Sequence, residues 1–216
     1  MTETTAMTMD ETADSAVEDT LAPAKNRKAG GRERLRAAAT ELFCASGYFP
    51  VSVEDIAAAA GVSRMTFYRH FPDKAALAAE LFRINAHAAT PRLLAIGQRD
   101  FRDRPVVEAW ITELSEADRA DRQLLRVFIQ ANADKTDFTD QGQAWIGELI
   151  VGLGATIPAF ALDPDNRGDR RRWFEAWLLL YEILDQGNHV ARGAGVFDDP
   201  LVIEILADRF VTFIEA

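Results

Sequence analysis

The sequence predicts an all-α protein, with a small N-terminal unit of three helices followed by a larger helical body. From Arg32 onward, apolar residues recur at spacings of three and four, which is the period of an amphipathic helix. No segment shows the strict alternation of a half-buried strand, and no internal repeat of solenoid length occurs. Glycines and prolines fall between the periodic segments and separate one predicted helix from the next.

The composition indicates a globular protein. The chain of 216 residues is 48% hydrophobic and has a net charge of −10, so it can bury a sizeable core. Its single cysteine, Cys44, lies in an apolar helical stretch and is predicted to be a small buried hydrophobe. No run of about 18 apolar residues predicts a membrane span, and residues 1–20 lack the features of a secretory signal. We therefore expect a cytoplasmic protein without a membrane partner.

Charge is distributed unevenly along the chain. Residues 1–24 carry six acidic and no basic side chains, whereas residues 25–80 carry nine Lys or Arg and six Asp or Glu. Because the first segment is too polar to bury apolar surface, residues 1–31 are predicted to form a disordered acidic tail followed by a basic hinge. The positive segment suits a polyanionic partner such as DNA, although a solvated surface can have the same composition.

The first predicted helix covers residues 32–46. One apolar face runs along it and Gly47 ends it, as glycine commonly does at a helix C-terminus. This face consists of Leu35, Ala38, Ala39, Leu42 and Phe43.

Two short helices come next. Ser52 and Asp55 predict a capping signal for a helix over residues 53–60, because the Ser52 hydroxyl can accept a hydrogen bond from an early amide. Gly61 permits a sharp turn, and Ser63 can cap a third helix over residues 64–70.

The body is predicted from longer periodic segments. Pro91 is assigned to the start of a helix, where a missing amide donor costs nothing, and four glycines loosen the 136–160 segment. The predicted helices cover residues 73–89, 91–98, 105–116, 121–132, 136–160, 169–192 and 200–214. We expect the N-terminal domain to occupy residues 32–78 and the body to occupy residues 79–216.

The second and third helices, joined by Ala60-Gly61-Val62-Ser63, predict a helix-turn-helix. Phe67 and Phe71 are four residues apart and give the third helix its inner face. The opposite, exposed face then presents Arg64, Met65, Tyr68 and Arg69, with Thr66 and His70 at its edges. Such side chains can reach base edges and phosphates from a helix in the major groove. A surface helix with basic side chains packed on a neighbour is the alternative.

Residues 32–82 resemble the DNA-binding domain of the TetR-type transcriptional repressors. The residues that carry the resemblance are Ala39, Leu42, Phe43, Gly47, Ser52, Val53, Ile56, Ala57, Ala60-Gly61-Val62-Ser63, Thr66-Phe67-Tyr68, Phe71, Lys74 and Leu77. The resemblance implies that Tyr68 contacts a phosphate or a base-edge methyl, and that Lys74 and Ser52 hold phosphates. It places Arg64, Met65, Thr66 and His70 toward the operator. Many members have Gly at the position of Met65, so Met65 leaves the base preference open.

The segment 173–192 is apolar almost all round, so it needs two packing partners. One stripe consists of Trp173, Trp177, Leu180 and Leu184, and the other of Phe174, Leu178 and Tyr181. The last helix offers Val202, Ile205, Leu206, Phe210, Phe213 and Ile214. The resemblance implies that these two helices pair with their copies in a homodimer, and the alternative is that both are buried within one subunit.

The resemblance also implies a pocket for a small-molecule effector among the middle helices. Its candidate walls are Trp110, Phe128, Trp145, Phe160, Trp177 and Tyr181, with His87, Gln130, Asn132 and His189 as possible polar anchors. Each aromatic residue could equally be plain core. Glu182, Asp185 and His189 share a helix face that could bind a divalent metal, but a solvated or interface face fits them as well. We expect no metal, no cofactor and no enzymatic activity, since no zinc-type cluster and no Walker loop occur.

The sequence thus predicts a homodimeric regulator, a repressor released from a palindromic DNA operator by an effector. An activator or a ligand-independent regulator of the same fold is the nearest alternative, and a helical enzyme or metal-binding protein a more distant one. Replacing Tyr68 or Lys74 by alanine is expected to weaken DNA binding without changing the thermal stability or the dimerisation.

Overall fold

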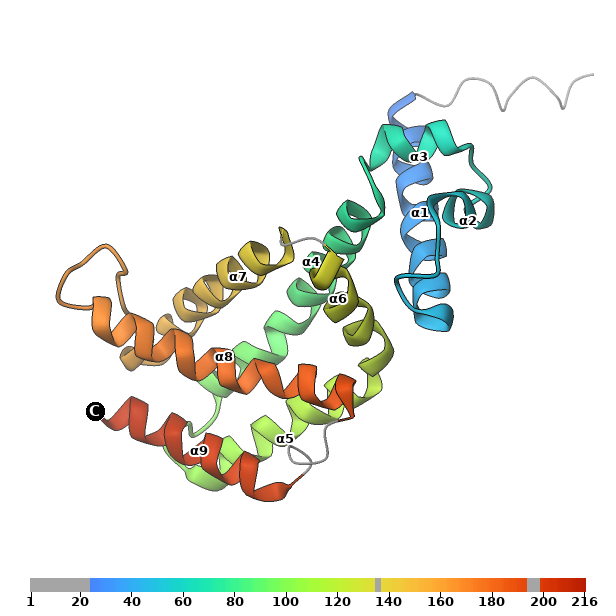
Figure 1. Cartoon of the computed structure of the whole chain (residues 1–216). Coiled ribbons are helices and arrows are strands. Elements are labelled where there is room, and N and C mark those ends of the chain that lie inside the picture. The colour runs from blue at the N-terminus through green and yellow to red at the C-terminus, as the bar shows by residue number, and fades with distance from the viewer. Residues whose placement is uncertain (1–23, 135–136, 194–198) are drawn as a thin grey trace, which may run out of the picture.

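The computed structural model describes residues 24–134, 137–193 and 199–216. These residues form α-helices and short 3₁₀ turns and contain no strand, which confirms the all-α prediction (Figure 1). The helices are α1 Ala24–Ser46, α2 Val53–Ala59, α3 Arg64–His70, α4 Lys74–Leu94, α5 Arg104–Ala120, α6 Arg122–Asp134, α7 Asp137–Gly154, α8 Arg170–Arg192 and α9 Pro200–Glu215.

Helix α1 begins earlier than we expected. It starts at Ala24, so the basic segment 25–31 continues the helix and the prediction of a hinge there is wrong. That segment combines Lys and Arg, which are good helix formers, with only two glycines. Of the acidic tail predicted for residues 1–24, residues 1–23 lie outside the described residues.

The signals that delimit α1, α2 and α3 act as predicted. Gly47 and Gly61 have positive φ angles of 84° and 63°, a backbone conformation that only glycine adopts without strain. Ser52 and Asp55 form a complete capping box at the start of α2, and the Ser63 hydroxyl accepts a hydrogen bond from the Thr66 amide at the start of α3. These caps fix the angle at which α3 leaves the turn.

Helix α4 continues through Pro91, where we expected a break. The two predicted helices 73–89 and 91–98 are one α-helix, Lys74–Leu94, followed by a 3₁₀ turn over Ala95–Gln98. His87 and Pro91 are both exposed, so the His87 carbonyl that loses its amide donor lies on the solvent side of the helix. As a result, α4 connects the N-terminal domain directly to the body.

Helix α7 ends at Gly154, whereas the predicted helix extended to Phe160. A side chain on Gly154 would place its Cβ 2.7 Å from the carbonyl oxygen of Phe160, so the chain folds back tightly at this glycine. Pro158–Phe160 form a separate 3₁₀ turn that directs Phe160 into the core.

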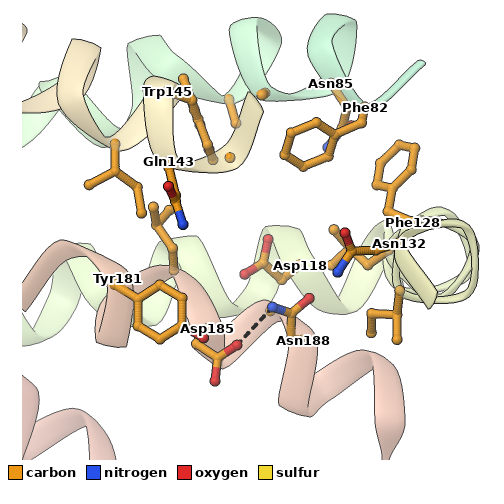
Figure 2. Close-up of a pocket in the computed structure, with 18 of the residues that line it drawn as sticks. Phe82, Asn85, Asp118, Phe128, Asn132, Gln143, Trp145, Tyr181, Asp185 and Asn188 are labelled. Carbon is orange, nitrogen blue, oxygen red and sulfur yellow. Dashed lines mark hydrogen bonds between the residues drawn. The ribbon is translucent and has the colours of Figure 1, made fainter. Parts of the chain in front are cut away.

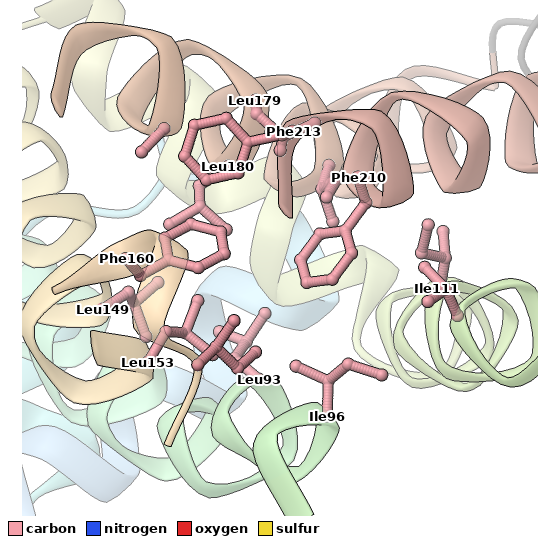
Figure 3. Packing of buried hydrophobic residues seen from close by; sticks show 14 of the residues in the cluster. Leu93, Ile96, Ile111, Leu149, Leu153, Phe160, Leu179, Leu180, Phe210 and Phe213 are labelled. Carbon is pink, nitrogen blue, oxygen red and sulfur yellow. The ribbon is translucent and has the colours of Figure 1, made fainter. Parts of the chain in front are cut away.

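The core of the body lies between α4, α5, α7, α8 and α9 (Figure 3). Phe160 packs against Phe210 and Phe213 of α9, with ring centroids 5.8 and 4.9 Å apart. A second core unites α1, α2, α3 and the first turns of α4, and it also includes Val127 and Phe128 of α6. Helix α6 therefore packs against the N-terminal domain as well as against α8 of the body.

Candidate nucleic-acid interface and effector cavity

Helix α3 presents a continuous exposed face. Phe67 is fully buried against α1 and α2, whereas Met65 is 76% exposed and Tyr68 41% exposed. Arg64 and Arg69 are exposed as well, and Thr66 and His70 are half-buried at the edges of this face. Helix α3 lies at the end of the molecule opposite α9 (Figure 1), and all six side chains have the exposed or edge positions that the sequence predicted for them.

Arg64 is held by two neighbours in the free protein. One guanidinium nitrogen lies 2.7 Å from the Glu54 carboxylate, and another donates a 3.2 Å hydrogen bond to the Tyr68 hydroxyl. The hydrogen bond with Tyr68 and the charge of Glu54 raise the pKa of Arg64 above its ordinary value. These contacts hold the guanidinium between Glu54 and Tyr68 and use two of its five N–H donors.

Ser52 is occupied by its capping role. Its hydroxyl donates to Asp55 Oδ2 at 2.6 Å and accepts from the Asp55 amide at 3.1 Å. These hydrogen bonds also hold the pKa of Asp55 below its ordinary value. Ser52 can donate to a phosphate only after it releases the Asp55 carboxylate.

Lys74 has a structural role that the sequence did not reveal. Its ammonium donates to the carbonyl oxygens of Tyr48, Phe49 and Val51 at 2.9, 3.3 and 2.8 Å. It also lies 4.2 Å from the centre of the Tyr48 ring, and burial lowers its pKa. Because the three donors of Lys74 hold the turn between α1 and α2, the expectation that its loss leaves the stability unchanged does not fit this geometry.

A second polar contact fastens the N-terminal domain to α4. Nε and Nη2 of Arg32 donate to the two carboxylate oxygens of Glu80, and the guanidinium lies 4.4 Å from the centre of the Phe71 ring. The hydrogen bonds from Arg32 lower the pKa of Glu80. Such a bidentate contact fixes the direction of α4 where it leaves the N-terminal domain.

The body contains a cavity of about 770 Å³ between α4, α5, α6, α7 and α8 (Figure 2). One wall is aromatic: Phe82 meets Phe128 edge to face at 5.4 Å and Trp145 at 6.4 Å. The polar groups on its lining are Asn85, Arg92, Asp118, Asn132, Thr139, Gln143, Asp185, Asn188 and Arg192. A volume of this size fits a small organic molecule.

Of the six aromatic residues predicted as pocket walls, four line this cavity, namely Phe128, Trp145, Trp177 and Tyr181, and of the four possible polar anchors Asn132 does so. The expectation fails for Trp110, which is buried in the body core and donates its indole N–H to the Arg92 carbonyl. It fails also for His189, which pairs with Asp185 at 3.1 Å and is not part of the lining. A residue on an apolar helix face can point into the core or into the cavity, and the sequence does not separate the two.

The other candidates divide in the same way. Asn132 lines the cavity, whereas Phe160 is core and His87 is exposed. Gln130 lies outside the cavity, and its side-chain oxygen accepts a 2.8 Å hydrogen bond from the Tyr48 amide.

The sequence reading missed Asp118, which lies inside the cavity. Burial raises the pKa of its carboxyl from 3.8 to about 6, while the charge of Arg92 opposes this rise. A signal was present in the sequence, because Asp118 follows Ile111 and Leu114 at the spacing of one helix face. That face is otherwise apolar.

An apolar stripe on α8 and α9 is left uncovered. Phe174, Leu178 and Tyr181 of α8, together with Leu201 and Ile205 of α9, are each about half exposed. The predicted second stripe of the 173–192 segment therefore faces outward. The expectation for the last helix is wrong at Leu206, Phe210 and Phe213, because these residues are buried in the core of their own subunit.

The acidic residues of α8 have partners other than a metal. Glu182 pairs with Arg209 of α9, and Asp185 accepts a 2.7 Å hydrogen bond from the Asn188 side chain. Within the described ranges, no three His, Cys, Asp or Glu side chains are grouped as a metal site would need. None of the helices that the structure describes has both the length and the hydropathy that a bilayer span requires.

Comparisons with known proteins agree with this geometry. Residues 35–81 match the sequence model of the bacterial regulatory proteins of the tetR family. No curated protein sequence matches the chain significantly.

Solved structures share the fold over most of the chain. A protein from Mesorhizobium loti, assigned to the TetR family of transcriptional regulators, aligns with a TM-score of 0.54 at 24% identity, covering 87% of this chain and 96% of its own. A protein from Streptomyces coelicolor A3(2), assigned as a transcriptional regulator, gives 0.60 at 24%, covering 83% and 97%. FadR of Thermus thermophilus, a TetR-family repressor solved with lauroyl-CoA, gives 0.51 at 21%, covering 85% and 93%.

Proposed function

Because residues 35–81 carry the DNA-binding domain of the tetR family of bacterial regulatory proteins, we propose that the chain is a homodimeric repressor that an effector releases from its operator. The observation that carries this proposal is the outward face of α3. Met65, Tyr68 and Arg69 are exposed, while Phe67 on the opposite side anchors the helix. An anchored helix with exposed Arg and Tyr side chains suits insertion into the major groove.

The exposed stripe on α8 and α9 supports a dimer. The half-exposed Phe, Leu, Tyr and Ile side chains of α8 and α9 lose contact with water when a second copy covers them. A two-fold axis through such an interface would present two copies of α3 to successive major grooves, about 34–36 Å apart on a palindromic site.

The cavity supports control by a small molecule. FadR is a repressor solved with an acyl-CoA, and the cavity of this chain lies in the helical body that the two proteins share. Its walls include Phe128 and Asn132 of α6, the helix that also packs against α1. A ligand that displaces α6 would therefore shift the N-terminal domain, provided that it binds the two arrangements with different affinities.

The test is a gel-shift titration with DNA from upstream of the gene that encodes this protein. It is repeated at several salt concentrations around the ionic strength of the cytoplasm. Groove binding by a basic face predicts an affinity that falls steeply with salt, because each phosphate contact releases counterions. Sedimentation of the same sample should give a mass of two chains. The proposal would be contradicted by a protein that sediments as a monomer and does not bind this DNA at low salt.

A further inference from the structure

The cavity holds a carboxylate that has no hydrogen-bond partner in the part of the chain that the structure describes. Asp118 of α5 points into the space between the Phe82 and Phe128 rings on one side and Asn188 on the other (Figure 2). None of the ion pairs among the described residues includes the Asp118 carboxylate. Burying a charge without a partner is costly, so such a group is ready to bind a ligand of opposite charge.

The other charged groups of the lining are paired or exposed. Asp185 is bonded to Asn188 and His189, while Arg92 and Arg192 of the lining are exposed. The nearby charge of Asp121 raises the pKa of Asp118 further, and that of Arg92 lowers it. Asp118 is therefore the charge inside the cavity that a ligand can neutralise.

Helix α8 leaves room for this carboxylate. A Cβ on Gly187 would lie 2.6 Å from Asp118 Oδ2, so only glycine at this position allows the carboxylate to keep its place. On the opposite side, the edge-to-face group of Phe82, Phe128 and Trp145 forms an apolar wall. One region of the cavity thus combines a negative charge with aromatic rings.

We propose that the effector is an amphipathic amine, whose protonated nitrogen binds Asp118 while its ring or hydrocarbon body packs against the aromatic wall. A protonated amine supplies the hydrogen bonds and the charge that Asp118 lacks, and aromatic faces also attract cations. An anionic group placed against the aromatic wall would instead be repelled by the like charge of Asp118. The inference rests on the proposed function, since it names the ligand class of that cavity.

Three probes of equal ring size test this ligand class. Calorimetric titration at pH 7.5 compares 1-naphthylmethylamine, 1-naphthalenemethanol and 1-naphthylacetate. The amine is expected to bind at least about tenfold more tightly than the alcohol, as a charge-assisted hydrogen bond in a half-buried site allows, and the acetate is expected to bind most weakly.

Two variants assign the preference to one carboxylate. Asp118→Asn is expected to abolish the amine preference while the alcohol keeps its affinity. Asp185→Asn removes a charge from the same lining, but from a carboxylate that already has partners, and is expected to keep the preference. Thermal melting of each variant confirms that it is folded.

Equal affinities for the amine and the alcohol would overturn the proposal, as would a preference that survives in Asp118→Asn. The absence of binding by all three probes to the folded protein would overturn it too. DNA binding, measured without any probe on the same sample, separates the two claims. If DNA binding fails while the amine preference holds, the regulator function is wrong and the ligand class stands.

Discussion

The hydroxyl of Tyr48 donates a 2.7 Å hydrogen bond to the carboxylate of Asp134. Tyr48 is fully buried at the turn between α1 and α2, and Asp134 is the last residue of α6. The backbone amide of Tyr48 bonds to Gln130, one turn earlier on the same helix. One residue of the N-terminal domain is thus attached at two points to the helix that lines the cavity.

Tyr48→Phe removes one of these attachments without changing the packing. Hydrogen bonds to a charged group contribute about 1.5–3 kcal/mol, so the variant should unfold at a lower denaturant concentration, and chemical denaturation measures this. Tyr68→Phe, which removes a hydroxyl from the exposed α3 face, is the matched control and should unfold near the wild-type midpoint. Equal midpoints for wild type and Tyr48→Phe would show that the hydrogen bond from Tyr48 to Asp134 does not stabilise the contact between the two parts of the protein.

Lys74→Met should lower the stability, because it leaves the carbonyls of Tyr48, Phe49 and Val51 without their donor. The expected cost is about 1–3 kcal/mol, which a thermal melt detects as a lower midpoint. The methionine keeps most of the apolar stem, so lost packing contributes little. If Lys74→Met melts like wild type but binds DNA more weakly, Lys74 acts on phosphate as the family resemblance implies, and its structural role is minor.

Glu54→Gln should strengthen DNA binding. Glu54 holds the Arg64 guanidinium and places a negative charge beside the face that approaches phosphate. Because the ion pair between Glu54 and Arg64 is exposed and screened by salt, the gain is expected to be small, about twofold to fivefold, and to shrink as salt is added. Fluorescence anisotropy with labelled DNA measures it. Glu116→Gln on α5 makes the same charge change in the body and should leave the affinity unchanged.

Asp118→Asn should stabilise the ligand-free protein at pH 7.5. The pKa of Asp118 is raised to about 6 in the folded state, so between roughly pH 4 and 6 the folded chain binds more protons than the unfolded chain. The stability contributed by this group therefore falls as the pH rises through that window. We expect Asn to add about 1–2 kcal/mol at pH 7.5, less than the full shift implies because part of the carboxylate reaches solvent.

The same comparison at low pH provides the control for Asp118→Asn. Near pH 3, below both pKa values, the wild-type carboxyl is mostly protonated in the folded and the unfolded state, so the two proteins should unfold at nearly the same denaturant concentration. A stability difference that does not change with pH would mean that the Asp118 charge is not buried at a cost.

Features of the fold that depend on neighbours in the sequence could be predicted. The Ser52 and Ser63 caps and the Gly47 and Gly61 turns each involve residues within about four positions, so the local pattern determines them. The amphipathic period also indicated which side of α3 faces outward. For the same reason, the sequence led to the helix-turn-helix and to its exposed residues.

Features that depend on distant partners could not be predicted. Lys74 lies next to carbonyls more than 20 positions away, and nothing near it in the chain signals that contact. Trp110 and Trp145 both lie on apolar helix faces, yet one is core and the other lines the cavity. The sequence around Pro91 resembles a helix start. The helix continues through Pro91 because the His87 carbonyl, which loses its amide donor there, faces solvent.

The most direct test of the regulator function is the DNA affinity of Tyr68→Ala relative to wild type, measured by anisotropy at one fixed salt concentration. Tyr68 is exposed and belongs to neither core, so the variant should melt with wild type and still form dimers. We predict that its affinity falls about tenfold or more, as the loss of a central interface aromatic commonly costs 1–3 kcal/mol or more. An unchanged affinity in a folded dimer would contradict the claim that α3 enters the groove with this face.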